Sequence, residues 1–146
     1  MPEARRPQSV LVIVYSSQGD VLLLKRALPF EFWQSVTGSL CHGETHGDAA
    51  ARELLEETGL GPDDCELTFS GIERVFTIDP RWRHRYAPGV VENLEYEWRC
   101  RLDRPRPVQL HREEHSEYCW LPVAEAIESV WSWTNRDALV ALRDSL

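Results

Sequence analysis

Residues 94–102 alternate between apolar and charged side chains, and this segment restricts the possible folds more than any other. Apolar residues occupy every second position from Leu94 to Leu102. The charged residues between them are Glu95, Glu97, Arg99 and Arg101. A period of two is typical of a β-strand that packs one face on a core and turns the other to solvent. The sequence therefore predicts a sheet strand here, with its charged face wet.

Other segments predict further strands and three helices. The predicted strands cover residues 9–15, 21–26, a short stretch ending at 38, 65–72, 74–78, 94–102 and 117–121. The predicted helices cover residues 45–58, 122 to about 130, and a last segment capped by Thr134. Turn residues at 16–20 join the first two strands as a hairpin, and residues 79–92 form a long loop. The order β-β-β-α-β-β-β-β-α-α predicts an α+β sandwich around a mixed sheet.

Length, charge and cysteine usage narrow the class of protein. A chain of 146 residues fits one domain, which we place at residues 1–146. The formal net charge of −8 argues against nucleic-acid binding through general electrostatics. The apolar run at 10–15 is too short to span a bilayer, and the four cysteines form no C-x-x-C pair. We therefore expect a cytoplasmic protein with reduced thiols and no nucleic-acid or membrane partner.

The predicted helix 45–58 gathers three glutamates on one face. At 100° per residue, Glu53, Glu56 and Glu57 lie within about 100° of one another. Like charges at i,i+4 cost roughly 0.2–0.5 kcal/mol even when exposed, and only Arg52 is near enough in sequence to offset them. A divalent cation would resolve the repulsion, since Mg²⁺ prefers carboxylate oxygens. The alternative is a solvated charged face, but such faces usually alternate in sign.

Residues 38–60 combine a glycine, a glutamate six residues later and an R-E-apolar-x-E-E-x-G-apolar run. This segment resembles the signature of the Nudix hydrolase family at every specified position. The resemblance implies an α/β/α sandwich that binds Mg²⁺ (or Mn²⁺) and hydrolyses a nucleoside-diphosphate-like bond. It also implies that Glu53 and Glu57 are principal metal ligands, that Glu56 is a ligand or lies close to one, and that Arg52 orients the carboxylates. By the same resemblance Glu44 supports the loop and helix.

Further segments resemble one group within this family, the bacterial dihydroneopterin triphosphate diphosphatases of folate biosynthesis. These segments are residues 5–7, 32–39, 84–90, 114–115 and 132–136. The resemblance implies cleavage of 7,8-dihydroneopterin triphosphate into the monophosphate and diphosphate, with Glu114 completing the metal site. The substrate contacts that it implies are Arg5, Arg26, Thr37, Ser132 and part of residues 76–79, of which we take Phe76 and Ile78. Arg85 is a further predicted contact. The base that accepts the proton of the attacking water stays open among Glu53, Glu56 and Glu114.

A basic island in this acidic chain covers the long loop and the predicted strand before it. Four arginines, interleaved with aromatic side chains, make up this island: Arg74, Arg81, Arg83 and Arg85. Guanidinium groups bind phosphate in a bidentate way, and aromatic rings can cover a flat heterocycle. A solvated basic loop is the alternative reading of the same residues. The island is therefore an additional candidate for substrate binding.

Two other functions stay open at the level of the sequence. A pterin and a purine present similar rings, so a nucleoside triphosphate pyrophosphohydrolase acting on dATP or an oxidised purine nucleotide is the nearest alternative. A non-catalytic Nudix module that senses a nucleotide is an alternative of another class. Such modules commonly lose glutamates of the signature, whereas this chain keeps all of them.

Overall fold

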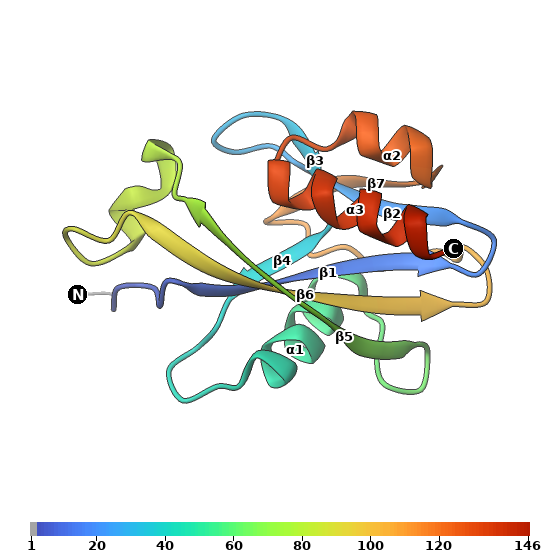
Figure 1. The fold of residues 1–146 in the computed structure, drawn as a ribbon, viewed down its shortest axis with the longest axis horizontal. Helices are drawn as coiled ribbons and strands as arrows, with labels where there is room; N and C mark the ends of the chain where they lie inside the picture. Colours follow the sequence, from blue (N-terminus) through green and yellow to red (C-terminus); the bar gives the residue numbers. More distant parts are fainter. Residues whose placement is uncertain (1–2) are drawn as a thin grey trace.

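The computed structural model describes residues 3–146, which form a seven-stranded sheet with helices on both faces (Figure 1). The strands are β1 (Gln8–Ser16), β2 (Asp20–Arg26), β3 (Phe32–Gln34), β4 (Val36–Ser39), β5 (Glu66–Thr77), β6 (Glu92–Leu102) and β7 (His115–Pro122). The central path of the sheet runs β3-β2-β1-β6-β5, with β4 paired to β1 and β7 paired to β2. Strands β1 and β6 are parallel and every other strand pairing is antiparallel. The sheet is mixed, as the sequence predicts.

The helices cover opposite faces of the sheet. They are α1 (His46–Thr58), the short 3-10 helix η1 (Pro80–Arg85), α2 (Val123–Ser129) and α3 (Trp133–Ser145). In Figure 1, α1 lies on one face, and α2 and α3 lie together on the other. The N-cap of α3 is Ser132, two residues before the predicted cap at Thr134. Within residues 3–146, none of the helices has both the length and the apolar character needed to cross a membrane.

Strand β1 supplies apolar side chains to both layers of the core. Val10, Val12 and Val14 pack with the cluster beneath α1, whereas Leu11 and Ile13 pack with the cluster beneath α2 and α3. Side chains of a strand alternate between the two faces, so a strand between two helical layers must be apolar at nearly every position. This position explains the unbroken apolar run at the start of the chain. The predicted α/β/α sandwich is confirmed.

One edge of β1 is shared between two partners, and this sharing opens the sheet. Pairing with β2 is confined to the turn end, where Tyr15 lies opposite Val21. Further back along β1 the partner is β4, which places Gly38 opposite Val10. Strands β2 and β4 therefore diverge from each other, and residues on both can face a common space.

The strand predictions need two corrections. Residues 65–72 and 74–78 belong to a single strand, β5, whose register with β6 shifts between Phe69 and Glu73. Gly71, at φ 85°, lies within this bulge, where a residue with positive φ bends the strand without ending it. Residues 36–39 form a separate strand, so four strands precede α1 and three follow it.

The charged face of β6 is largely buried, which contradicts the predicted wet face. Glu97 is 0% exposed and Glu95 is 5% exposed. Glu97 forms ion pairs with Arg74 of β5, at 2.8 Å, and with Arg99, at 3.3 Å. Arg99 also donates a hydrogen bond to the Ser145 hydroxyl of α3. Burial of Glu97 is tolerated because opposite charges pair beneath the helix.

Candidate active site

Helix α1 begins and ends at residues that suit helix termini. The Thr45 hydroxyl accepts a hydrogen bond from the Asp48 amide at 3.1 Å, and Gly59 adopts a left-handed conformation at φ 79°. Between these ends the helix buries Ala49, Ala50 and Leu54 against the sheet. That packing fixes the rotation of the helix, and it turns two of the three clustered glutamates inward.

Glu57 is the most deeply buried carboxyl group of the predicted cluster. Its side chain is 1% exposed, and neither carboxyl oxygen has a hydrogen-bond partner among the described residues. Burial raises the pKa of Glu57 well above its ordinary value, and the neighbouring Glu53 and Glu114 carboxyl groups raise it further. A buried carboxyl group without partners is unfavourable unless a proton or a cation accompanies it.

Glu57, Glu114 and His115 bring ligand atoms within 4.8 Å of one another. Burial lowers the pKa of His115 to about 4, so the imidazole is neutral near pH 7. Its Nε2 lies 2.9 Å from the Gln34 amide Nε2, which donates to it, and 3.7 Å from Glu57 Oε1. His115 therefore offers Glu57 neither a charge nor a proton. The carboxyl groups of Glu57 and Glu114 suit a divalent cation, which would satisfy the unpartnered oxygens of Glu57, whereas the acceptor nitrogen of His115 is already used by Gln34.

Arg52 connects the helix to the preceding loop. Its Nε and Nη2 donate to the two oxygens of Glu44 at 2.8 and 2.9 Å, and its Nη1 donates to Glu53 Oε1 at 2.8 Å. The Arg52 hydrogen bonds hold the pKa of Glu44 at about 2. Arg52 Nη2 also donates to the Ser39 carbonyl at 3.1 Å. The guanidinium therefore fixes one oxygen of Glu53 relative to β4.

Gly38 makes room for the Glu53 carboxyl group. A Cβ atom at position 38 would overlap the Cδ and both carboxyl oxygens of Glu53. The requirement is steric, because β4 packs directly against the glutamate and Gly38 has an ordinary strand backbone. Glycine at this position is therefore part of the architecture of the site.

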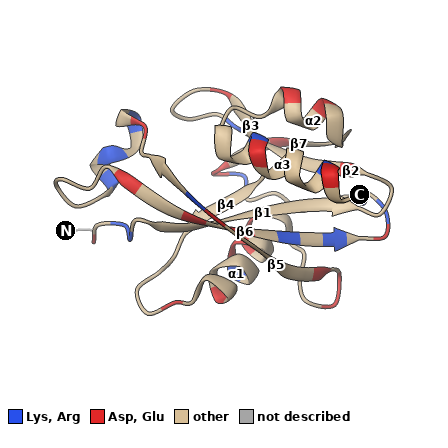
Figure 2. Ribbon diagram, in the orientation of Figure 1, with Lys and Arg blue, Asp and Glu red and all other residues tan. Residues whose placement is uncertain are grey.

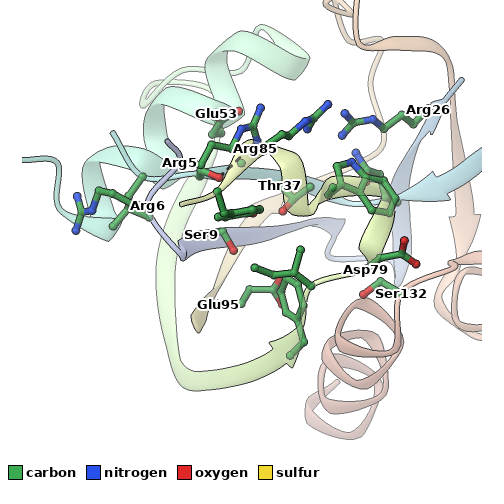
Figure 3. A pocket seen from close by; sticks show the side chains of 18 of the residues that line it. Arg5, Arg6, Ser9, Arg26, Thr37, Glu53, Asp79, Arg85, Glu95 and Ser132 are labelled. Carbon is green, nitrogen blue, oxygen red and sulfur yellow. Dashed lines mark hydrogen bonds between the residues drawn. The ribbon is translucent and has the colours of Figure 1, made fainter. Parts of the chain in front are cut away.

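A cavity of about 810 Å³ opens next to these residues (Figure 3). All seven predicted substrate contacts line it, together with Arg52, Glu53 and Glu114. Glu57, whose side chain is 1% exposed, is not among the lining residues. The Glu56 side chain is 52% exposed and accepts a hydrogen bond from Arg52 outside the cavity. The structure thus brings Glu53, Glu57 and Glu114 together and leaves Glu56 at the margin.

Five of the lining residues are arginines, and besides Arg6 and Arg52 these are Arg5, Arg26 and Arg85, which come from different segments of the chain. In Figure 3, Arg5, Arg26 and Arg85 lie along one side of the cavity. Burial lowers the pKa of Arg85, and the positive charges of Arg5 and Arg26 lower it further. Guanidinium groups that repel one another are suited to binding an anion with several charges, such as a polyphosphate.

Most of the basic island predicted from the sequence points elsewhere. Figure 2 shows basic residues concentrated on η1, but only Arg85 of the island lines the cavity. Arg74 pairs with Glu97, Arg81 pairs with Asp79, and Arg83 donates to the Ile78 carbonyl. These three arginines stabilise the loop and the strand that precedes it. Of the four arginines, only Arg85 stays a predicted substrate contact, whereas the interleaved aromatic residues Phe76, Trp82 and Tyr86 all line the cavity.

Glu95 also lines the cavity, although no pattern in the sequence pointed to it. Burial raises the pKa of Glu95 to about 7, and the Thr134 hydroxyl and Arg74 oppose that effect. The carboxyl group lies on the cavity wall contributed by β6. Glu95 lies on the face of β6 that the sequence predicts to be wet. Alternation alone cannot show that α3 covers this face.

The raised pKa of Glu95 predicts a pH-dependent cost in stability. The folded state binds the proton of the Glu95 carboxyl group more tightly than the unfolded state does. The stability that this proton contributes is therefore fully present below pH 4.5 and is lost as pH rises through about 7. Glu95→Gln removes this titration. The variant's unfolding free energy relative to the parent should therefore increase by up to about 3 kcal/mol between pH 4.5 and pH 8. Urea unfolding of both proteins across this range measures the difference, and a difference independent of pH would contradict the assignment.

The chain is similar to known proteins over most of its length. Residues 5–142 match the NUDIX domain family. The dihydroneopterin triphosphate diphosphatase of Escherichia coli strain K12 is 42% identical over 138 residues, which cover 92% of this chain and 91% of that protein. The enzyme of the same name from Haemophilus influenzae is 34% identical over 142 residues, covering 95% and 89%. The solved structure of the E. coli dihydroneopterin triphosphate pyrophosphohydrolase matches with a TM-score of 0.87 and 38% identity, over 93% of this chain and 94% of that one.

Proposed function

Because the chain belongs to the Nudix hydrolase family, we propose that it hydrolyses 7,8-dihydroneopterin triphosphate to the monophosphate and diphosphate, a step of folate biosynthesis. The observation that carries the proposal is similarity over nearly the whole chain to enzymes with this name, at 42% identity over 92% of the sequence. The pocket agrees with it, since it combines carboxylates, arginines and apolar walls. The proposal treats residues 1–146 as one Nudix domain that acts on a small molecule in the cytoplasm.

Nudix hydrolases generally use divalent metal ions, and we propose Mg²⁺ for this chain, with Mn²⁺ as a substitute. Glu53, Glu57 and Glu114 would hold the ion, and Glu56 stays a candidate at the margin. The two unpartnered oxygens of buried Glu57 support this assignment. When bound, the ion supplies the positive charge that phosphate oxygens need beside carboxylates, and it makes water easier to deprotonate.

Side chains of the protein would bind the substrate, position it and accept the proton of the attacking water. Arg5, Arg26 and Arg85 would bind the triphosphate and hold it in line for attack by water. A carboxylate must accept the proton of that water. Of the three candidate bases, Glu53 and Glu114 line the cavity, whereas Glu56 lies outside it. This placement favours Glu53 or Glu114, and Arg52 would keep Glu53 in position.

A substrate panel tests the proposal. We expect kcat/KM for 7,8-dihydroneopterin triphosphate with Mg²⁺ to exceed that for dATP and for 8-oxo-dGTP by about 10-fold or more. The released product should be diphosphate, and EDTA should abolish its release. Higher kcat/KM for either nucleotide would replace the proposal with a nucleotide pyrophosphohydrolase. No diphosphate release from any substrate, together with nucleotide binding, would identify a sensing module.

A further inference from the structure

The two sides of the cavity differ in chemistry. In Figure 3, Arg5, Arg26 and Arg85 lie toward one side with Glu53, whereas Glu95 and Ser132 lie toward the other. We expect the triphosphate of the substrate to bind beside the arginines and the clustered glutamates. The heterocycle at the other end of the substrate must then extend toward Glu95. The contacts made at that end decide which heterocycle is accepted.

Glu95 has hydrogen-bonding capacity that the protein does not use. The residue is 5% exposed, and its Oε1 has no hydrogen-bond partner among residues 3–146. No lysine, arginine or histidine of the described chain lies within ion-pair distance of it, in contrast to Glu97 two positions later, which pairs with Arg74 and Arg99. A buried acceptor without a partner is costly, so its retention on a cavity wall indicates that a ligand completes it.

The surroundings of Glu95 suit a flat polar ring. Phe76, Ile78 and Trp133 line the same cavity and can pack on the faces of a heterocycle. The Ser132 and Thr134 hydroxyls lie 2.9 Å apart, and the Thr134 hydroxyl in turn favours the charged form of the Glu95 carboxyl group and so lowers its pKa. This end of the cavity therefore combines apolar walls with a small set of polar groups around one acceptor.

We propose that the Glu95 carboxylate accepts hydrogen bonds from the ring N–H and the exocyclic amino group of a 2-amino-4-oxopyrimidine ring, and so selects a pterin over an adenine. The inference rests on the proposed function and adds the recognition of the heterocycle to it. The edge of such a ring presents two adjacent donors, and a carboxylate presents two acceptors. Adenine presents one donor beside a ring nitrogen that accepts, and this nitrogen would face a carboxylate oxygen. A mismatch of that kind leaves buried polar groups unpaired and discriminates strongly.

The variant Glu95→Gln tests the inference through a change in specificity. The glutamine amide presents one acceptor and one donor, which suits adenine and mismatches the pterin edge. We expect the ratio of kcat/KM for 7,8-dihydroneopterin triphosphate to that for dATP to fall by about 30-fold or more. The matched control is Glu97→Gln, which alters a buried glutamate on the same face of β6 that does not line the cavity. Its ratio should stay within about threefold of the parent.

Binding of neopterin, which has the heterocycle but no phosphate, gives a second measurement. Its Kd, followed by pterin fluorescence, should rise about 10-fold or more in Glu95→Gln and stay unchanged in Glu97→Gln. If Glu95→Gln does not fold, Glu95→Asp, which keeps the charge and withdraws the carboxylate, should lower the same ratio. A folded variant that keeps both the ratio and the Kd within threefold overturns the inference. If the parent protein prefers dATP, the proposed function fails instead, so the two failures are distinguishable.

Discussion

Replacing Glu57 with Gln is expected to lower metal-dependent diphosphate release by about 100-fold or more while the protein stays folded. Glutamine keeps the shape of the side chain and removes its charge. The two oxygens of Glu57 have no partner within the described chain, so in the proposed site only a bound cation satisfies them. Because burial raises the pKa of Glu57, the neutral side chain should also leave the thermal stability equal or higher at pH 7. Steady-state kinetics and thermal unfolding measure the two effects separately.

The control for this variant is again Glu97→Gln, a second fully buried glutamate. Glu97 pairs with Arg74 and Arg99, so its replacement leaves two arginines without a counter-charge and should lower stability. Its kcat/KM should nevertheless stay within about threefold of the parent. If Glu57→Gln loses activity and keeps its stability, while Glu97→Gln loses stability and keeps its activity, the loss of activity comes from the missing charge and not from a weakened fold. Parent-like activity of Glu57→Gln would show that Glu57 is not a metal ligand.

The features predicted best from the sequence are those that local rules determine. The ends of α1 follow from Thr45 and Gly59, and the grouping of Glu53 with Glu57 follows from helical spacing. The same spacing also groups Glu56 with them, yet Glu56 remains half-exposed. Which of three neighbouring glutamates turns inward depends on how Ala50 and Leu54 pack against the sheet, and spacing alone does not contain that information.

The sequence was least informative about residues whose burial depends on contacts between distant segments. The alternating pattern of β6 predicts that its charged positions face solvent, because no local signal shows that α3 covers them. Glu97 is buried together with Arg74 of the neighbouring strand, which the register places opposite Glu95 and which pairs diagonally with Glu97. The sequence also does not separate the arginines of the basic island, since neighbours such as Arg83 and Arg85 point in different directions from η1.

Replacing Gly38 with Ala is expected to lower kcat/KM by about 100-fold or more, although it adds only one methyl group. The new Cβ would occupy the position of the Glu53 carboxyl group. Strand β4 cannot retreat easily, because Gly38 is paired with Val10 of β1, and α1 is held by its buried alanines. Glu53 would have to rotate away and lose its 2.8 Å hydrogen bond from Arg52.

Gly47→Ala is the matched control for Gly38→Ala. A Cβ at this position, in the first turn of α1, would lie 3.4 Å from the Trp98 ring, which is ordinary van der Waals contact. Alanine also favours a helix over glycine by up to about 1 kcal/mol, so this variant should keep full activity and equal or higher thermal stability. Kinetics and unfolding of both variants provide the comparison. Gly38→Ala with activity close to that of Gly47→Ala would show that the position of the Glu53 carboxyl group does not limit the reaction, and Glu53 would then lose its proposed place in the site.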